Sequence, residues 1–235
     1  KPNLLIMKKI LLLTVFFSAF TLTKAQDNNA LQIMEGVSYF WCPAFYYFST
    51  ADLTIEAWVK LDDTEVVDDY TAVVDGRYGG VGGSQQKSKA LIFKTINDKL
   101  TLSYEWEGAW GFEDSDGLSE VQRGEWQHVA MVVDGTAKTT TFYIDGYPGA
   151  VHSPTSTDPK EYGNVGKEIS WDTLFVGGGN TDPARTIIGL IDEIRVWNVA
   201  RTATDITNNM THEIEPNDKL LAYYRCNESP GDTVL

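Results

Sequence analysis

The chain has 235 residues, of which 43% are apolar and 12% aromatic, and it carries a formal net charge of −14 at pH 7. A chain of this length can bury a full core, and all-β sandwiches of this size commonly form one domain. The negative charge argues against nucleic acid and anionic membranes as partners, because both are bound by basic patches. An acidic surface suits cation binding, or serves solubility alone.

The first segment of the chain predicts export. Lys8 and Lys9 precede an apolar run, Ile10–Leu22, and the small residue Ala25 follows it, which is the order of a signal peptide. The run is too short to span a bilayer comfortably. We therefore assign residues 1–25 to a signal peptide and predict a secreted or cell-surface protein with no membrane insertion after cleavage.

The mature part of the chain, residues 26–235, is predicted to form one domain. Residues 1–6 precede Met7, where the signal peptide would start, and are interpreted as over-called coding sequence. The sequence stops at Leu235 without a terminal feature, so a domain truncated at its C-terminus is one interpretation.

Short alternating runs of apolar and polar residues fill most of the mature chain. Successive side chains of a strand point to opposite faces, so this alternation indicates half-buried strands. Turn pairs such as Asp75-Gly76 and Asp145-Gly146 close or bend the runs. The pattern predicts an antiparallel sandwich. The predicted strands are Leu53–Lys60, Leu91–Lys94, Leu100–Trp106, His128–Val133, Thr139–Ile144, Leu174–Val176, Ile187–Trp197 and Lys219–Cys226.

Three long irregular segments separate these strands: Val66–Ser88, Glu107–Gly124 and Tyr147–Ile169. Loops of this length are usually binding edges or mobile decoration. Aromatic residues gather in such loop contexts, and exposed aromatic planes stack on sugar rings or anchor protein partners. We predict Tyr78, Trp110 and Trp171 as ligand contacts, the alternative being that the loop aromatics pack under their own loops.

Glu105 and Glu107 are the residues that suggest an enzyme. They lie two apart on a predicted strand, so they share a face at a Cα separation of about 6.5–7 Å. Glycoside hydrolysis needs paired carboxylates near this spacing. Such pairs are more often surface charge, and the alternate residues Leu102 and Tyr104 supply the apolar face. We therefore predict no catalytic residues and keep a glycoside hydrolase as an alternative.

The segment GLIDEIRVW places an aspartate within an apolar strand. Counting alternate residues puts Asp192 on one face together with Leu190, Ile194 and Val196. A carboxylate that faces a core is costly unless something binds it. The opposite face carries Glu193 and Arg195, which we interpret as a solvated ion pair worth less than about 1 kcal/mol.

A short helix is predicted near residues 202–210. Thr202 and Asp205 have the spacing of a capping box, and Ile206 and Met210 fall one turn apart on one face. A helix of this length is unstable alone, so it must pack on the sandwich.

Several motifs occur in a characteristic order along the chain. They are Ala30-Leu31 with Gly36, LTIEAWVK at 53–60, GEWQHVAMVVDG at 124–135, FYIDG at 142–146, GLIDEIRVWNVART at 189–202 and LLAYYRCNES at 220–229. Together, over about residues 30–231, they resemble the LamG-like jelly-roll domains of the concanavalin A-like lectin/glucanase superfamily. The resemblance implies an all-β jelly roll of two curved antiparallel sheets. It also implies a non-catalytic module of a secreted or surface protein that binds glycans or proteins, often with bound calcium.

The resemblance further implies calcium ligands on the late strand and the first strand. Calcium takes 6 to 8 oxygen ligands. The candidates are Asp192, Glu35 and the carbonyl of Gly36, which would hold a structural calcium ion. Glu35 stands where the family usually has aspartate, and an aromatic-rich insertion, Tyr39–Phe48, follows. In the alternative interpretation, Asp192 accepts hydrogen bonds from loop amides.

The two cysteines, Cys42 and Cys226, lie near opposite ends of the mature chain. An exported protein meets an oxidising compartment, in which they would form a disulfide and make the terminal strands neighbours. Two buried thiols are the alternative.

The predicted function is therefore a non-catalytic module that binds a polysaccharide or a surface glycoprotein and carries a structural calcium ion. A glycoside hydrolase using Glu105 and Glu107 is one alternative, and an adhesion module that binds protein alone is another. The fold does not decide among them, because one sandwich can host all three.

Overall fold

The computed structural model describes residues 30–33, 40–42, 51–63, 71–77, 89–96, 99–106, 112–114, 120–152, 173–178 and 186–227. The predicted signal peptide, residues 1–25, lies outside these ranges. Among the helices that fall within them, none has the length and apolar character needed to cross a bilayer.

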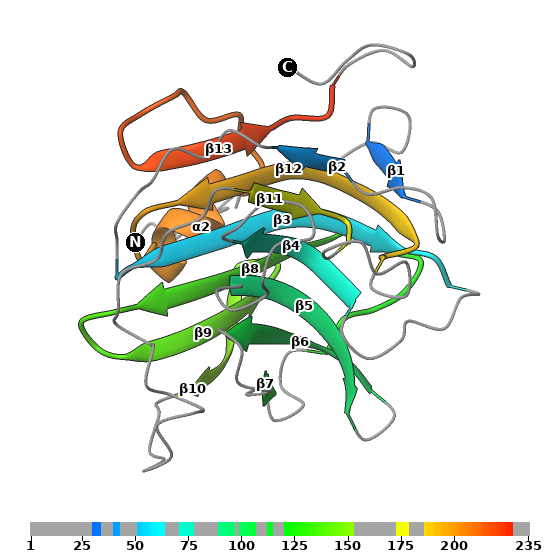
Figure 1. Ribbon diagram of the computed structural model, residues 1–235, viewed down its shortest axis with the longest axis horizontal. Helices are drawn as coiled ribbons and strands as arrows, with labels where there is room; N and C mark the ends of the chain where they lie inside the picture. The colour runs from blue at the N-terminus through cyan, green and yellow to red at the C-terminus, as the bar shows by residue number, and fades with distance from the viewer. Residues whose placement is uncertain are drawn as a thin grey trace, which may run out of the picture.

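The described chain forms two antiparallel sheets that face each other (Figure 1). Sheet A has the strand order β1-β12-β3-β8-β9-β10, with β13 also paired to β12. Its strands are β1 (Leu31–Ile33), β3 (Leu53–Leu61), β8 (Gln127–Asp134), β9 (Thr139–Ile144), β10 (Tyr147–His152), β12 (Gly189–Trp197) and β13 (Leu220–Tyr224).

Sheet B has the strand order β2-β11-β4-β5-β6-β7. Its strands are β2 (Phe40–Cys42), β4 (Thr71–Arg77), β5 (Lys89–Ile96), β6 (Lys99–Trp106), β7 (Phe112–Asp114) and β11 (Thr173–Val176). In both sheets, strands distant in sequence lie side by side, as β12 and β3 do. The predicted all-β jelly-roll sandwich with one short helix is confirmed.

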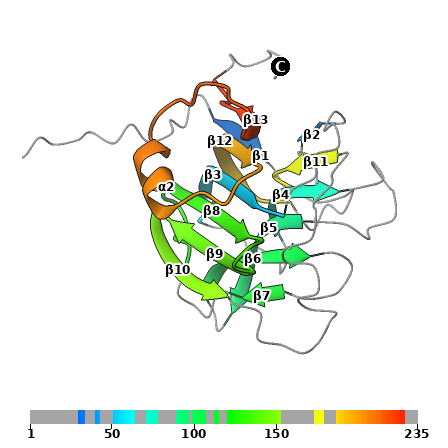
Figure 2. The same cartoon turned by 90° about the vertical axis from the view of Figure 1, so that its left-hand side faces the viewer.

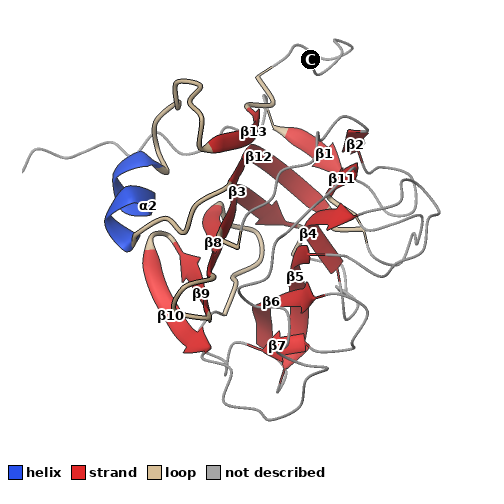
Figure 3. Cartoon of the chain, turned by 60° about the vertical axis from the view of Figure 1, so that its left-hand side comes forward, coloured by secondary structure: helices blue, strands red, loops and turns tan. Residues whose placement is uncertain are grey.

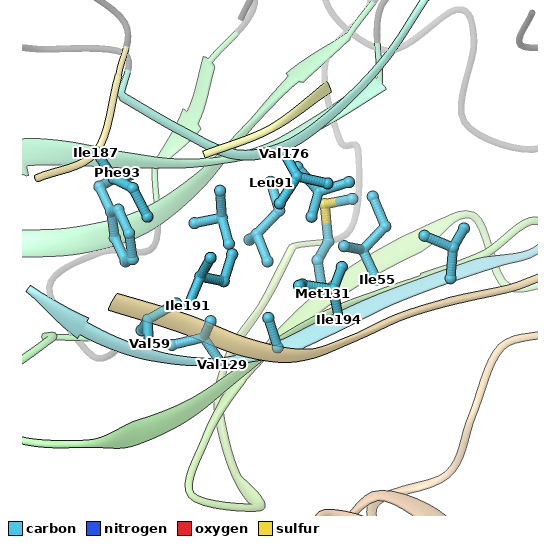
Figure 4. Close-up of a cluster of buried hydrophobic side chains, with 14 of the residues drawn as sticks. Ile55, Val59, Leu91, Phe93, Val129, Met131, Val176, Ile187, Ile191 and Ile194 are labelled. Atoms are coloured by element: carbon cyan, nitrogen blue, oxygen red, sulfur yellow. The ribbon is translucent and has the colours of Figure 1, made fainter. Parts of the chain in front are cut away.

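The core lies between the two sheets. Along β3, Ile55, Ala57 and Val59 alternate inward and are at most 1% exposed. They meet side chains from sheet B such as Leu91 and Phe93, both fully buried (Figure 4). Alternating apolar positions on facing sheets therefore build one continuous core, as the sequence pattern predicts.

Strand β4 was not predicted, because it lies inside the segment Val66–Ser88 that the sequence marks as irregular. Its apolar residues Ala72, Val73 and Val74 are consecutive rather than alternating, and all three are buried. The pairing of β4 with β5 shifts register between Ala72 and Val74. A bulge of this kind inserts an extra residue and hides the period of two on which the sequence argument rests.

A second bulge, in β12, overturns the predicted faces of that strand. Asp192 pairs with Trp58 of β3 and Arg195 pairs with Glu56, so the two intervening residues of β12 lie opposite one residue of β3. Glu193 takes a φ of 51° there. The alternation slips by one residue at this point. The face of β12 that enters the core therefore carries Ile191, Ile194 and Val196.

Asp192 consequently lies on the outer face of sheet A, the side away from sheet B, and not on the core face with Ile194 and Val196. Arg195 shares this outer face, since it pairs with Glu56. The prediction that Asp192 and Arg195 point to opposite sides is wrong, because it assumed an unbroken strand.

Helix α2 (Ala203–Asn209) covers the outer face of sheet A (Figures 2 and 3). Thr202 is its N-cap, and Thr202 and Asp205 exchange the two hydrogen bonds of a capping box. The hydroxyl of Thr202, at 2.7 Å, and its amide, at 3.1 Å, both donate to Asp205 Oδ2 and hold the pKa of Asp205 below its usual value. Ile206 is fully buried against Ala130 and Tyr143. The predicted helix and its packing on the sandwich are confirmed.

Strand β12 has two different partners along one edge. Strand β1 pairs with Gly189–Ile191, and β13 pairs with Ile194–Trp197. The bulge at Glu193 lies between the two. Segments from the two ends of the described chain thus meet end to end on one strand.

Candidate functional site

A cleft of about 640 Å³ opens at one end of sheet A, where β1 and β3 end and β12 begins. We call it the end cleft. It is lined by Gln32, Ile33, Lys60, Leu61, Asp62, Asp63, Gly124, Ile188, Gly189 and Leu190. Its volume falls in the range of sites that bind small molecules, about 300–1,000 Å³.

Backbone hydrogen bonds hold the walls of the end cleft together. The amide of Asp62 donates to the carbonyl of Ile188, and the amide of Gly124 donates to the carbonyl of Leu61, both at 2.9 Å. Gly189 has a φ of 147°, and a Cβ there would lie 2.2 Å from the carbonyl oxygen of Lys60. Only glycine therefore permits β12 to approach β3 so closely at the cleft.

The rim of the end cleft is polar and its floor is apolar. The side chains of Gln32, Asp62 and Asp63 are exposed, whereas Ile33 and Leu61 are buried. Carboxylates accept hydrogen bonds from hydroxyl groups, and an amide both donates and accepts them. The rim of the cleft is thus suited to a polyhydroxylated ligand.

A second cluster of charged side chains lies on the outer face of sheet A, beneath helix α2 and the turn that follows it. We call it the charge network. Its members come from β3, β8, β12 and the segment before α2, and they are Glu56, His128, Glu193, Arg195 and Arg201.

Glu56 is the centre of the charge network and is fully buried. Its Oε1 accepts hydrogen bonds from Trp197 Nε1, at 2.9 Å, and from Arg201. Arg195 Nη1 lies 3.8 Å from the same oxygen. Burial raises the pKa of Glu56, and the guanidinium groups of Arg201 and Arg195 oppose that shift.

Arg195 joins β12 to the end of helix α2. It is 0% exposed, and its guanidinium donates to the carbonyls of Asn209, at 2.9 Å, and His212, at 2.7 Å. It also donates to Glu193 Oε2 at 2.5 Å, and Tyr223 donates to that same oxygen at 2.5 Å. The prediction of a solvated Glu193–Arg195 pair is wrong, because helix α2 and its following turn cover this face.

His128 lies in the charge network with 1% of its surface exposed. Its Nε2 is 3.7 Å from Glu56 Oε2, and the ring of Trp58 packs edge-on with centroids 5.5 Å apart. Burial, aided by Arg195 and Arg201, lowers the pKa of His128 to about 3. The imidazole is therefore neutral at physiological pH and has no route to a substrate.

The predicted aromatic ligand contacts, Tyr78, Trp110 and Trp171, lie outside the described residues. So does Glu107. Glu105 lies in β6, opposite Ala90 of β5 and Phe112 of β7.

The predicted calcium ligands are only partly described, since Glu35 and Gly36 lie outside the described ranges. Asp192 is 4% exposed, and its Oδ1 accepts the amide of Glu193 at 2.8 Å. In β1, Ile33 pairs with Gly189 rather than with Asp192. Within the described ranges, no three His, Cys, Asp or Glu side chains gather as a metal-binding group.

The two cysteines lie near different sheets. Cys42 is the last residue of β2 in sheet B, and Cys226 follows β13 of sheet A. The Cys226 side chain is 6% exposed and belongs to the core between the sheets. Its Sγ lies 3.9 Å from the carbonyl oxygen of Tyr224. The disulfide stays a prediction, since the side chain of Cys42 is not described.

Sequence reasoning missed both the end cleft and the charge network. The motif LTIEAWVK does place Glu56 on the face opposite Ile55 and Ala57. The arginines that meet Glu56 lie about 140 residues further along the chain, for example Arg201, 145 residues away. The alternation of residues thus predicts which face of the strand carries Glu56, but it does not predict which side chains bind Glu56.

Comparison with known proteins begins with a family model described as the concanavalin A-like lectin/glucanase superfamily, which matches residues 35–207. No curated protein matches the chain. Solved structures share the fold at low sequence identity. One is a candidate carbohydrate-binding protein from Bacteroides ovatus, 19% identical with a TM-score of 0.57. The match covers 85% of this chain and 52% of that one, so the chain spans about half the length of that protein.

Two further structures match over most of both chains. Domain 4 of AbnA, an extracellular arabinanase from Geobacillus stearothermophilus in complex with arabinotriose, is 20% identical with a TM-score of 0.53, covering 75% of this chain and 74% of that one. The CBM40 of the Ruminococcus gnavus IT-sialidase is 13% identical with a TM-score of 0.53, covering 77% and 97%. The match to the family model spans most of the chain, and the chain belongs to the concanavalin A-like lectin/glucanase superfamily.

Proposed function

We propose that this protein is a non-catalytic carbohydrate-binding module, exported from the cell, that binds a polysaccharide or the glycan of a surface glycoprotein. The observation that carries the proposal is the presence of a polar cleft of about 640 Å³ on a fold whose solved examples hold oligosaccharides. Those examples are the arabinanase domain with arabinotriose and the CBM40 with sialyllactose.

The buried Glu56–His128 pair supports a binding role over catalysis. Glu56 and His128 form an acid–base pair 3.7 Å apart, yet both are at most 1% exposed. A general acid or base must come within hydrogen-bond reach of its substrate. Helix α2 and its following turn block such an approach, so this pair is structural.

A glycan array on the full chain tests the proposal. We expect binding to at least one class of oligosaccharide, followed by a measurable enthalpy of binding in titration calorimetry. Binding to no glycan would overturn the proposal. Binding to a glycoprotein that survives enzymatic removal of its glycans would point instead to a protein-binding adhesion module.

A glycoside hydrolase is the second candidate, and the register of sheet B is the observation that favours it. Asp75 pairs with Ala90, and Ala90 pairs with Glu105, so the two acidic positions lie in one cross-strand row. Two strand spacings separate their backbones by about 10 Å. Inverting hydrolysis uses carboxyl groups about 6.5–9.5 Å apart. Asp75 is 1% exposed, which weighs against access by a polysaccharide.

A reducing-sugar assay on the glycans that bind separates the two candidates. We expect no release of sugar by the wild type. Release that is lost in both Asp75→Asn and Glu105→Gln, with binding retained, would establish the hydrolase instead. Glu107→Gln tests the other glutamate of the predicted pair in the same assay.

We also propose a structural calcium ion held in part by Asp192. Among the three predicted ligands, Asp192 is the one that lies in the described residues. It offers the calcium ion one carboxylate, whose Oδ1 already accepts a hydrogen bond from the amide of Glu193. Glu35 and the carbonyl of Gly36 would complete the set. We expect EDTA to lower the melting temperature and added calcium to restore it. A melting temperature unchanged by both additions would remove the ion from the proposal.

Export is the last part of the proposal and rests on the signal-peptide pattern of residues 1–25. The expected disulfide between Cys42 and Cys226 would join β2 of sheet B to the end of β13 in sheet A. Intact-mass analysis of exported protein, with and without reductant, checks both points. A chain that keeps residues 1–25 and two titratable thiols would contradict them.

A further inference from the structure

We infer that the end cleft is the glycan site of this protein and that it takes uncharged oligosaccharides in preference to sialylated or otherwise anionic ones. The inference rests on the proposed function and adds to it a location and a class of ligand.

The end cleft has more acidic than basic side chains. Among its lining residues, Asp62 and Asp63 are acidic and exposed, and Lys60 is the basic one. Arg123 lies nearby, but it is not among the lining residues, and its Nη1 donates to the backbone oxygen of Asp62 at 3.2 Å. The cleft therefore presents more negative than positive side chains to a ligand.

These charges weaken the binding of an anionic sugar and do not weaken the binding of a neutral one. Lys60 offsets one of the two carboxylates, and the remaining net charge of −1, about 6 Å from a ligand anion in water, disfavours it about threefold in affinity. The net charge of −14 adds a long-range repulsion that lowers the rate of encounter. A neutral sugar instead donates its hydroxyl protons to these carboxylates, in hydrogen bonds stronger than those between neutral groups.

The end cleft also combines apolar and polar lining residues. The half-buried Ile188 and Leu190 offer apolar surface to the C–H face of a sugar ring, whereas Ile33 and Leu61 beneath them are at most 2% exposed. Gln32 stands on the rim and supplies both donor and acceptor atoms.

The end cleft is also separate from the charge network. It lies on β1 and at the ends of β3 and β12, whereas the charge network lies beneath helix α2 around Glu56. Side chains of the cleft rim can therefore be replaced without disturbing buried ion pairs. This separation makes the inference testable by substitution.

The first experiment presents the full chain with lactose, α2,3-sialyllactose and arabinotriose, alongside an array of neutral and anionic glycans. Lactose and sialyllactose differ by one sialic acid, so the pair isolates the charge. We expect the glycans that bind to be neutral and the addition of sialic acid to weaken binding about threefold. No binding to any glycan would overturn the proposed function. Binding confined to anionic glycans would keep that function and overturn the inferred preference.

The second experiment tests the location with the strongest neutral ligand from the array. Gln32→Ala combined with Asp63→Ala removes two rim groups, and we expect affinity to fall at least about tenfold. Asp218→Ala is the matched control, because Asp218 is exposed and lies in the turn before β13. Both variants must keep the wild-type melting temperature. Unchanged affinity in the folded double variant would place the glycan elsewhere.

A third variant separates charge from hydrogen bonding. Asp62→Asn with Asp63→Asn keeps acceptor oxygens on the rim and removes two negative charges. We expect the discrimination against sialyllactose to shrink about tenfold while binding of the neutral glycan stays within a few-fold of wild type. Discrimination that is unchanged in this variant would contradict the electrostatic argument.

Discussion

The charge network and the end cleft both gather charged side chains on sheet A, yet they use them differently. In the network, Glu56 and Arg195 are fully buried and form an ion pair. Glu56 also accepts a hydrogen bond from Trp197, and Arg195 donates to the carbonyl of Asn209 at the end of helix α2. In the cleft, Asp62 and Asp63 are exposed to solvent. Of these two clusters of ionisable groups, the end cleft is therefore the one whose acidic side chains are open to a ligand.

The same contrast separates the two faces of strand β3. Ile55 and Ala57 face sheet B and pack among hydrocarbon, whereas Glu56 between them faces helix α2 and is equally buried. An apolar core accepts many sequences of similar volume. A buried ion pair requires its partners in place, because a lone buried charge is costly. The outer face should thus be less tolerant of substitution than the core.

The largest expected effect follows from removing the centre of the charge network. Glu56→Ala leaves Arg195 and Arg201 buried without their carboxylate, and we expect a loss of about 3–5 kcal/mol in the free energy of unfolding. Urea denaturation followed by tryptophan fluorescence measures it. Asp63→Ala in the end cleft is the control, with an expected change below about 0.5 kcal/mol. Equal losses of unfolding free energy in the two variants would contradict the expected difference between the charge network and the end cleft.

Acid should destabilise the protein through His128. Its folded-state pKa of about 3 lies below the unfolded value of 6.5, so its contribution is fully present above pH 6.5 and is lost as pH falls toward 3. Between pH 7 and 4.5 we expect a loss of about 2–3 kcal/mol from this group.

The raised pKa of Glu56 acts with the opposite sign, because its contribution is present at low pH and is lost as pH rises through the folded-state pKa. The difference between the wild type and His128→Gln, taken by urea denaturation at each pH, isolates the histidine. A variant with the same acid sensitivity as the wild type would show that another group is responsible.

A smaller effect is expected at the start of helix α2. Thr202→Ala removes the side-chain oxygen that accepts the amide of Asp205 at 3.1 Å, and we expect a loss of about 1 kcal/mol. The affinity for glycan should not change, since the helix lies away from the end cleft. Thr202→Ser, which keeps the hydroxyl group, should retain the wild-type stability. Weakened glycan binding in the alanine variant would couple the two regions.

The sequence predicts the parts of this fold that depend on local pattern. Strands β3, β8 and β9 lie within one residue of their predicted bounds, and the capping box of Thr202 and Asp205 marks helix α2. Both signals come from residues within a few positions of each other. The family motifs then supply the order of the strands, which local pattern cannot.

The parts that escaped prediction depend on interruptions and on long-range partners. The bulge at Glu193 requires a positive φ in an acidic residue, for which glycine would be the usual sign. It reverses the face of every residue before it relative to those after it. The segment that covers Glu56 contains Arg201, 145 residues further along the chain. The end cleft is formed by residues of three strands that meet only in the folded chain.

Strand β12 depends on both ends of the described chain for its outer edge. Gly189–Ile191 is paired by β1, near the start, and Ile194–Trp197 by β13, near the finish. During synthesis the second half of that edge must wait for residues 220–224 to leave the ribosome, with its amides and carbonyls unpaired in the meantime. An interrupted or shortened product would expose the same open edge, so this strand is where self-association of incomplete chains should begin.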